Sequence, residues 1–299
     1  MILCCGEALI DMLPRTTPAS EAAFAPYAGG AVMNTAIALG RLGARSGYFG
    51  GVSNDLFGEI LTDTLTASHV DHSLCARSDR PTTLAFVTLV DGHAKYAFYD
   101  ENTAGRMLST SDLPTLEDDV STLFFGGISL VGEPAADTYA ALCAQAGNRV
   151  VMIDPNIRPG FITDEARYRA RLEKMLARAD IVKISDEDMD WLGTTAADLL
   201  KGGTAIVLIT RGAEGVDIVT REGTKTVPAQ KVDVVDTVGA GDTFNAGFLA
   251  GLDQAGLLSR DKLAAVWLDD LVPAAQLGAK TAAITVSRAG ANPPWSHEL

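Results

Sequence analysis

The segment Val232–Gly251 holds the residues whose types and spacing are best suited to chemistry. Its first β-branched residues predict a strand, and Gly239-Ala240-Gly241 then leads into a helix whose apolar side includes Phe244. A glycine turn at a helix start directs several backbone N–H groups to one point, and the helix dipole adds positive potential there. The sequence therefore predicts an anion-binding site at residues 239–241.

Asp242 follows directly, in the first turn of the same helix. A carboxylate next to a bound phosphate is unfavourable unless it accepts a proton from an attacking hydroxyl, which is the role of an Asp in phosphoryl transfer. Taken alone, Asp242 is equally explained as an acid that the helix dipole favours. Other phosphate motifs are absent, because the chain has no Gly-Lys dipeptide and Phe244 stands where a G-x-G-x-x-G fingerprint needs glycine.

Composition limits what else the chain can bind. Its 299 residues include 38 Asp and Glu against 24 Lys and Arg, a net charge of -14. Such a chain does not attract nucleic acid or an anionic membrane through its overall field. A phosphate ligand must therefore be held locally, by backbone amides, helix ends, single cations or metal.

The cysteines and the N-terminus are typical of a protein in the reducing interior of a cell. The four cysteines form no C-x-x-C pair, and the adjacent Cys4 and Cys5 must face opposite sides of a strand, so we expect buried free thiols. The four histidines form no metal-ligand set. The N-terminus resembles a strand rather than a signal peptide, and no apolar run approaches the roughly 18 residues of a membrane span. We therefore expect a cytoplasmic protein.

The elements around the anion site alternate between strand and helix. This order predicts an α/β fold, a doubly wound and mostly parallel sheet with helices on both faces. We expect one domain over residues 1–299, with a small antiparallel appendage. Predicted strands are 2–5, 9–13, 46–52, 123–125, 150–153, 181–183 and 205–209, predicted helices are 31–42, 54–67 (with Asn54 as its cap), 134–146 and 165–177, and 82–90 with 95–99 form a hairpin around Asp91-Gly92.

Several motifs together resemble the ribokinase-like, PfkB-type family of carbohydrate kinases, and within it the bacterial fructokinases. GAGDTFNAG after Asp236-Thr237 is similar to the family's C-terminal signature, and Gly29-Gly30 with Asn34 to its N-terminal one. Further similar blocks follow in the family's order, at residues 38–44, 50–52, 154–158, 209–215 and 285–294. The resemblance covers the whole chain. It implies transfer of the γ-phosphoryl group of ATP to a sugar hydroxyl.

The resemblance also implies roles for individual residues. Asp242 would be the catalytic base, with Gly239, Ala240 and Gly241 as the anion hole. A β-sheet lid, formed by strands near 9–28 and by the hairpin 82–99, would cover the sugar. The sugar-binding residues would be Asp11, Gly30, Asn34, Tyr96, Phe98, Arg158 and Asp242.

For ATP, the resemblance implies contacts from Thr210, Gly212, Gly215 and Gly241, with the adenine near Leu277–Lys280. Mg²⁺ would bridge the phosphates mostly through water. The family's Asn-x-x-Glu motif is replaced here by Ser185 and Asp188, so Asp188, or Glu187 if the turn shifts, would serve the Mg²⁺–water network. A monovalent cation, K⁺, would be held by Asp236 and by the carbonyls of Val238, Val286 and Ala289.

The identity of the sugar remains open between two substrates. Residues 96–108 and 154–158 are more similar to fructokinases than to ribokinases, and Asp11, Asp100 and Glu101 would make the lid end of the pocket acidic, which suits neutral fructose. 2-Keto-3-deoxygluconate is the alternative, because Arg158 and Arg106 could bind its carboxylate. A non-catalytic sugar- or nucleotide-sensing module is the alternative from another class, and a dehydrogenase is disfavoured by the missing fingerprint. We also consider a homodimer that forms through the lid.

Overall fold

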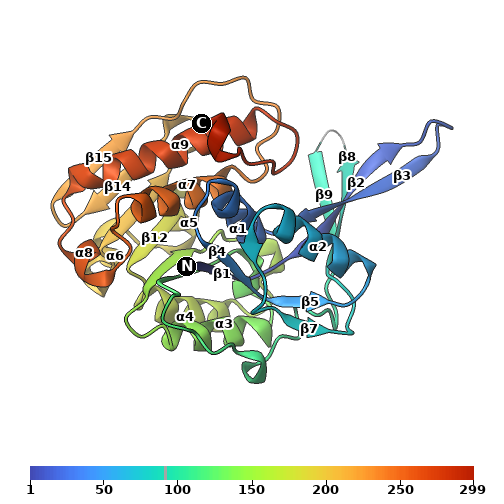
Figure 1. The fold of residues 1–299 in the computed structure, drawn as a ribbon, viewed down its shortest axis with the longest axis horizontal. Helices are drawn as coiled ribbons and strands as arrows, with labels where there is room; N and C mark the ends of the chain where they lie inside the picture. The colour runs from blue at the N-terminus through green and yellow to red at the C-terminus, as the bar shows by residue number, and fades with distance from the viewer. Residues whose placement is uncertain (91–92) are drawn as a thin grey trace.

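Helices cover both faces of a long central sheet (Figure 1). The computed structural model describes the backbone of residues 1–90 and 93–299, and its description of side chains leaves out residues 88–96. Within these residues the sheet has nine strands, parallel except at one edge. In spatial order they are β15 (Gly223–Val227), β14 (Val216–Thr220), β13 (Ile206–Thr210), β12 (Ile181–Ser185), β11 (Val150–Asp154), β10 (Thr122–Gly126), β1 (Ile2–Cys5), β4 (Ser46–Phe49) and β6 (Val70–Asp71).

The central strand β1 shows why the sheet is buried on both faces. All four of its residues are buried; Ile2 and Cys4 pack into the apolar cluster on one face, and Leu3 and Cys5 into the cluster on the other. A strand covered on both sides needs continuous apolar residues, which ILCC supplies. All four cysteines are free and Cys75 is only partly buried, so the prediction of buried free thiols is confirmed for three of them.

The helices form two layers. One face carries α1 (Ala31–Arg41), α2 (Leu56–Ala67), α7 (Ala240–Gln254), α8 (Arg260–Ala264) and α9 (Val272–Val286), and the other carries α3 (Ala135–Ala144), α4 (Glu165–Leu176), α5 (Asp186–Leu192) and α6 (Ala196–Gly202). The predicted doubly wound α/β fold is therefore confirmed.

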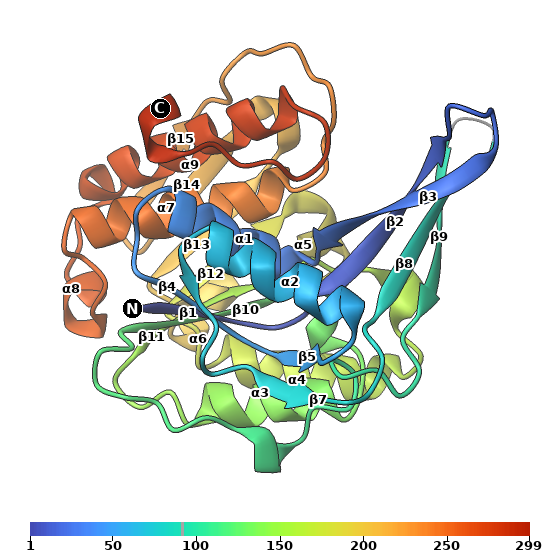
Figure 2. The ribbon, with the colours of Figure 1, turned by 45° about the vertical axis from the view of Figure 1, so that its right-hand side comes forward.

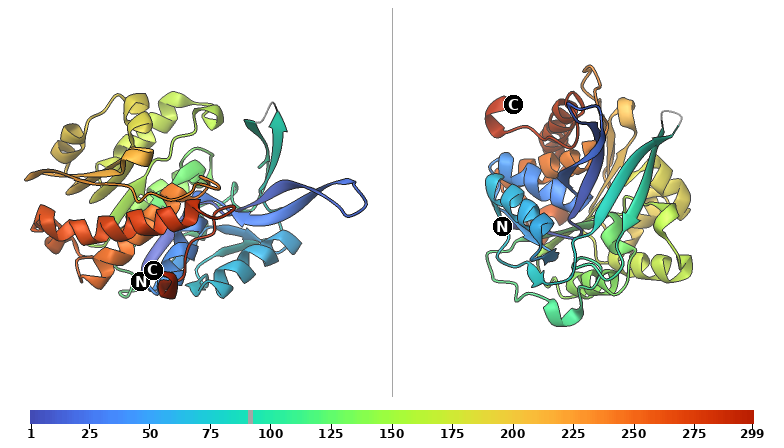
Figure 3. Two further views of the ribbon diagram at one scale, coloured as in Figure 1. Left: turned by 90° about the horizontal axis from the view of Figure 1, so that it is seen from above. Right: turned by 90° about the vertical axis from the view of Figure 1, so that its right-hand side faces the viewer.

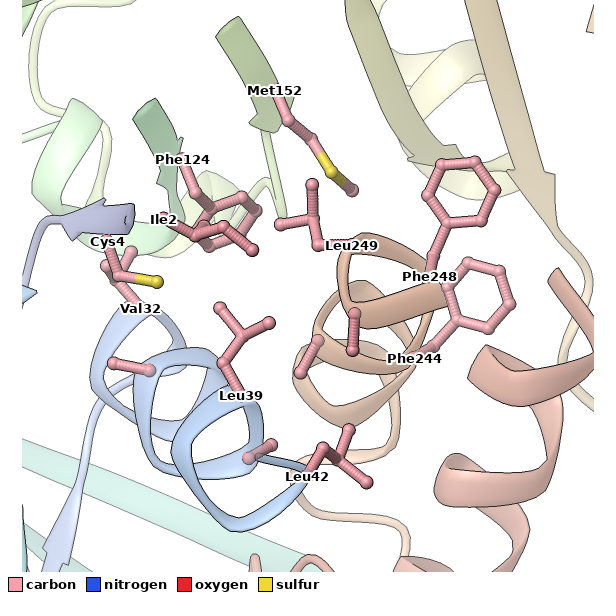
Figure 4. Packing of buried hydrophobic residues seen from close by; sticks show 14 of the residues in the cluster. Ile2, Cys4, Val32, Leu39, Leu42, Phe124, Met152, Phe244, Phe248 and Leu249 are labelled. Carbon is pink, nitrogen blue, oxygen red and sulfur yellow. The ribbon is translucent and has the colours of Figure 1, made fainter. Parts of the chain in front are cut away.

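Helix α7 is fixed between α1, α9 and the sheet. Figure 4 shows Leu249 of α7 pointing toward Phe124 and Met152 of the strands, with Leu39 of α1 on one side and Phe248 beside Phe244 on the other. On its other side α7 closely approaches α9. A Cβ on Gly247 would lie 2.7 Å from the Cα of Gly278, and one on Gly251 2.6 Å from the Cα of Ala274. The small residues of this helix thus fix the place of its N-terminus, where the candidate chemistry lies.

A second sheet projects from the body (Figures 2 and 3). Its order is β3 (Ala22–Gly29), β2 (Leu9–Thr16), β8 (Leu84–Val90) and β9 (His93–Tyr99), antiparallel except between β2 and β8. These strands include the residues expected to form a lid. The turn predicted at Asp91-Gly92 lies outside the described residues. Strands β5 (Gly51–Ser53) and β7 (Ala76–Ser78) pair separately.

Two predictions for the N-terminal half are wrong, the single strand over residues 46–52 and the cap at Asn54. Residues 46–52 are not one strand, because β4 belongs to the central sheet and β5 pairs with β7. Helix α2 is capped by Asp55, whose Oδ1 accepts from the amides of Phe57 and Gly58 at 3.1 and 2.8 Å. The side chain of Asn54 instead binds Asp79 and Arg77.

The β-branched residues from Val232 do not form the predicted strand. Val234 and Val235 are 63% and 64% exposed and belong to no described strand. The amides of Val235 and Asp236 instead donate hydrogen bonds to the backbone carbonyl of Val286, at 2.8 and 3.1 Å. With no neighbouring strand beside it, β propensity alone cannot build a strand. Within the described residues, no helix is long and apolar enough to cross a bilayer.

Candidate active site

The N-terminus of α7 forms the turn that the glycine motif predicts. Gly239, with φ of 77°, precedes the helix, and a Cβ on it would lie 2.7 Å from the Cβ of Ala291, so the position needs glycine. Among the described residues, the N–H groups of Gly241 and Asp242 have no acceptor, whereas that of Ala240 reaches the carbonyl of Thr237 at 3.3 Å. Two amides at a helix start are thus available to an anion.

Asp242 is buried beside this turn and bonded to α1. Asn34 Nδ2 donates to Asp242 Oδ2 at 3.0 Å, and Thr35 Oγ1 donates to the backbone oxygen of Asp242 at 3.2 Å. The residue is only 8% exposed. Burial raises the pKa of Asp242 to about 6, against the opposing effects of the Asn34 hydrogen bond and of Lys183 and Arg158. Asp242 is therefore a carboxylate at neutral pH and an effective proton acceptor.

A second buried charged group lies under the same turn, and sequence reasoning missed it. Lys183 Nζ and Asn245 Nδ2 both approach Asp154 Oδ2, at 3.0 and 2.8 Å. A Cβ added to Gly241 would lie 3.2 Å from Lys183 Nζ. The signal for Lys183 was present, because a lysine interrupts the buried strand sequence IVKIS.

The predicted sugar residues of the N-terminal half come together next to α1. A Cβ on Gly29 would lie 2.2 Å from Asp11 Oδ2, so the carboxylate of Asp11 lies directly over the backbone there. Gly30, with φ of 105°, approaches the backbone oxygen of Glu7 closely. Asp11 has no hydrogen-bond partner among the residues that the structure describes, and burial raises its pKa to about 6. A half-buried carboxylate without a protein donor is suited to accept from ligand hydroxyls.

Glu7 is another residue beside the candidate site that sequence reasoning missed. Its carboxylate accepts from the amide of Ala31 at 2.9 Å and from the amide of Ser129 at 3.2 Å. Burial raises the pKa of Glu7 to about 7. Glu7 thereby joins the start of α1, which carries Asn34, to the loop after β10. Its only signal in the sequence was a glutamate between two apolar segments, two residues after the end of β1.

The projecting sheet meets the body through two aromatic rings. Phe98 of β9 packs edge-on against Phe161, with ring centroids 4.6 Å apart, and both line a cavity of about 200 Å³. Phe161 lies three residues after Arg158, whose Nη1 donates to the carbonyl of Ile157 at 3.0 Å. Among the described residues Arg158 has no carboxylate partner. The side chain of Tyr96 lies outside the described residues.

Asp100 and Arg106, which the sequence suggested would each act on the sugar, form an ion pair with each other. Arg106 Nη1 lies 3.2 Å from Asp100 Oδ2, and Arg106 Nε donates to the carbonyl of Glu133 at 2.6 Å. Asp100 also accepts from the hydroxyls of Thr83 and Thr103. Asp100 and Arg106 therefore largely neutralise each other. Among the described residues Asp11 and the exposed Glu101 remain as unpaired acids, and Arg158 stays without a carboxylate partner.

The residues expected near the nucleotide lie at the end of β13, in the turn after it, and in the middle of α9. Thr210 ends β13 and is followed by the short turn Gly212–Glu214. A Cβ on Gly215, with φ of 106°, would lie 2.2 Å from the backbone oxygen of Val227, so backbone packing alone explains this glycine. Residues 227–230, 276–277 and 279–280 border a cavity of about 510 Å³. This cavity includes the region predicted for adenine.

The residues expected to hold a monovalent cation also lie together. Asp236 Oδ1 accepts from the amide of Val238 at 3.0 Å, and Oδ2 from the amide of Gly290, next to Ala289, at 2.9 Å. The carbonyl of Val286 already accepts two amides. No cluster of three or more His, Cys, Asp or Glu suited to a metal occurs in the described part of the chain. A cation here would therefore depend on carbonyls and on Asp236.

Ser185 and Asp188 have structural partners of their own. Ser185 caps α5, because its Oγ accepts from the amide of Asp188 at 3.0 Å. Asp188 Oδ1 accepts from the amide of Ile157 at 3.2 Å, so Asp188 holds the loop that carries Arg158. Burial, followed by the charge of Asp154, raises the pKa of Asp188. Glu187 is exposed at the start of α5.

The sequence of the chain is similar to those of known sugar kinases. The sequence model described as pfkB family carbohydrate kinase matches residues 1–298. A fructokinase of Rhizobium leguminosarum bv. trifolii is 56% identical over 273 residues, which are 89% of this chain and 84% of that protein. A fructokinase of Escherichia coli is 35% identical over 86% of each chain.

Solved structures show the same similarity. A fructokinase of Xylella fastidiosa with bound ATP has a TM-score of 0.88 and 31% identity, over 97% of this chain and 93% of that one. A double mutant of a Vibrio cholerae fructokinase, bound to fructose, ADP and a potassium ion, has a TM-score of 0.83 and 26% identity, over 97% of this chain and 93% of that one.

Proposed function

The chain belongs to the pfkB family of carbohydrate kinases, and on this premise we propose that it is a fructokinase, which forms fructose 6-phosphate from D-fructose and ATP. The observation that carries the proposal is the position of Asp242, buried beside the free amides of the α7 turn and bonded to Asn34. A base and an anion site in direct contact are what phosphoryl transfer to a hydroxyl requires.

In this mechanism Asp242 takes the proton of the attacking hydroxyl. The oxygen then forms a bond to the γ-phosphorus, and the bond from that phosphorus to the β–γ bridging oxygen breaks, which releases ADP. The amides of the α7 turn donate to the phosphoryl oxygens as negative charge shifts among them. Because the pKa of Asp242 is about 6, the base is ionised at neutral pH without being so acidic that it accepts protons poorly.

The sugar is held by groups that converge on the same place. Asp11 accepts from sugar hydroxyls, since it has no other donor within the described residues. Asn34 orients Asp242 and lies where its amide also reaches the substrate. Gly30 would allow the chain to pass close to the ring, and we expect Tyr96, Phe98 and Arg158 to border the substrate from the lid and from the loop after β11.

ATP, Mg²⁺ and K⁺ complete the proposal. Thr210, Gly212 and Gly215 would lie along the nucleotide, with adenine at residues 277–280. Mg²⁺ would neutralise phosphate charge, and Asp188 with its neighbours would serve its water network, although Asp188 already holds the amide of Ile157. K⁺ would order the loop of Asp236 with Val238, Val286 and Ala289; the hydrogen bonds that join these two turns support that fit.

Charge pairing in the pocket favours a neutral sugar over 2-keto-3-deoxygluconate. Because Asp100 neutralises Arg106, a substrate carboxylate would depend on Arg158 alone while facing the unpaired Asp11. A charge placed near a like charge costs several kcal/mol in a protein site, which is about 1 to 3 orders of magnitude in kcat/KM.

The test is ADP formation with a panel of sugars at fixed ATP, Mg²⁺ and potassium. We expect kcat/KM for fructose to exceed that for 2-keto-3-deoxygluconate. A reversed ratio would replace fructose by the sugar acid as substrate. No ADP release above that of the Asp242→Asn variant with any sugar would favour a non-catalytic sensing module instead.

The lid and the location complete the proposal. The single domain 1–299 would use strands near 9–28 and the hairpin 82–99 as a lid, and a second copy would pair with it. Phe24 and Tyr99 are 42% and 62% exposed, and both contact Phe86 on one face of this sheet, an apolar surface that a homodimer would cover. A monomeric mass by light scattering at micromolar concentration would refute the dimer. Free cysteines support a cytoplasmic location.

A further inference from the structure

Lys183 combines deep burial with unused hydrogen-bonding capacity. Its side chain is 8% exposed, on strand β12 in the middle of the central sheet. An ammonium group has three N–H donors, and within the described residues only one of them has a partner, Asp154 Oδ2 at 3.0 Å. Burying a lysine is costly unless its charge and its donors are used.

The ammonium group also lies at the anion turn. A Cβ on Gly241 would be 3.2 Å from Lys183 Nζ, so Nζ stands directly above the Cα of the residue whose amide is free. The strands of the sheet end at this edge, where open α/β sheets bind their ligands. Lys183 is thus the buried cation next to the place where the phosphoryl group must sit.

The partner of Lys183 is itself held in place. Asp154 Oδ2 also accepts from Asn245 Nδ2 at 2.8 Å, while Asp154 Oδ1 and Asn245 Oδ1 are buried without a partner. Asn245 lies one turn beyond Gly241 on α7. The three side chains therefore tie β11 and β12 to the first turns of α7, with polar capacity left over beside the anion turn.

We propose that Lys183 is a further catalytic residue, whose ammonium group donates to the transferring phosphoryl group while Asp154 and Asn245 hold it in position. The inference rests on the proposed function, since it concerns the same transfer. Lysine binds phosphate as a compact point charge, and this charge would offset the negative charge that the phosphate brings next to Asp242. The amides and Lys183 then contact the phosphoryl group from two sides.

A purely structural salt bridge is the competing explanation, and a double variant separates the two. In Lys183→Met, loss of the cation leaves Asp154 buried and unpaired, so slow turnover or poor folding would fit either explanation. Asp154→Asn removes the negative charge. The double variant, Lys183→Met with Asp154→Asn, carries neither the positive nor the negative charge. Lys201→Met, at an exposed position on α6, is the matched control.

We expect the double variant to fold, to bind ATP and fructose, and to turn over at least about 100-fold more slowly than Asp154→Asn, as when an oxyanion donor is removed. The Michaelis constant for fructose should change little. Turnover of the double variant within about ten-fold of Asp154→Asn would overturn the proposal. An inactive parent enzyme would count against the proposed function instead, so the two failures are distinguishable.

The acid limb of the pH–rate profile gives a second readout, because it reports whether the charges of Lys183 and Asp154 lie where the structure places them. Lys183 lowers the pKa of Asp242 and Asp154 raises it, with Asn34 and Arg158 as the other polar neighbours and Glu7 behind α1. The acid limb of kcat/KM should therefore move to higher pH in Lys183→Met and to lower pH in Asp154→Asn. Shifts in the same direction in both variants would contradict the assigned positions of these charges.

Discussion

Replacing the base by its amide should remove activity and at the same time stabilise the fold. In Asp242→Asn the carboxamide cannot take the hydroxyl proton, and loss of a general base lowers turnover by about 10²–10⁴-fold. The amides of the α7 turn remain, so ATP binding should largely persist. Stability should rise because the parent protein buries an ionised carboxylate, whereas the variant buries a neutral group.

The size of the stabilisation follows from the pKa of Asp242. Folding raises this pKa from 3.8 to about 6, mainly through burial. At pH values between these two pKa values, the folded state binds more protons than the unfolded state. The free energy of unfolding of the parent therefore falls as pH rises through this window. At about 1.4 kcal/mol per pKa unit, a shift of about two units costs the parent roughly 3 kcal/mol above the window and nothing below it. The variant does not carry this cost.

Urea unfolding followed by tryptophan fluorescence measures the difference between parent and variant. We expect similar free energies of unfolding at about pH 4 and a clear advantage of Asp242→Asn, up to roughly 3 kcal/mol, at about pH 8. Asp63→Asn, at an exposed position on α2, is the control and should change stability by less than about 0.5 kcal/mol at both pH values. The reasoning is refuted if Asp242→Asn is no more stable than the parent at the higher pH. It is equally refuted if the variant retains more than about a tenth of the parent turnover.

Three further predictions concern the same site. Gly241→Val should lower turnover more than fructose affinity, because its side chain would meet Lys183 Nζ, 3.2 Å from the first added carbon, and crowd the phosphoryl group; normal turnover with only weaker sugar binding would contradict this. Potassium should activate the enzyme relative to tetramethylammonium at equal ionic strength, because a cation at Asp236 would order the loop before α7; equal rates in the two salts would argue against a cation there. Saturating fructose should slow amide hydrogen exchange in β8, because closure of the lid excludes water from the phosphoryl group; unchanged exchange would mean that the sheet does not close on the sugar.

The fold could be predicted from the sequence where local pattern and tertiary context agree. Strands such as ILCC are apolar throughout because both faces of the sheet are covered, and the four residues show this burial. The stretch from Val232 has the same β-branched character, but no strand lies beside it, and it stays exposed. At α2 the sequence predicted Asn54 as the cap, but Asp55 caps the helix because the side chain of Asn54 binds Asp79 and Arg77.

The candidate site was predictable as far as its motifs reach. The glycine turn, Asp242 and Asn34 belong to recognisable segments, and the structure joins them by a 3.0 Å hydrogen bond. Lys183 and Asp154 lie 29 residues apart on neighbouring strands, so their contact depends on the strand order of the sheet. The pairing of Asp100 with Arg106 is also invisible in a list of charges, although it changes the expected electrostatics of the sugar pocket.

The net charge of -14 makes the placement of the few cations in this site important. An acidic protein repels a nucleotide at long range, but salt screens that field within about 10 Å, so binding depends on the groups in contact with the phosphates. Two free amides, Lys183 and Arg158 supply positive potential at the α7 turn, and they face Asp242, Asp154 and Asp188. In the proposed mechanism each carboxylate has a separate role: Asp242 accepts the proton, Asp154 holds Lys183, and Asp188 anchors the loop that carries Arg158.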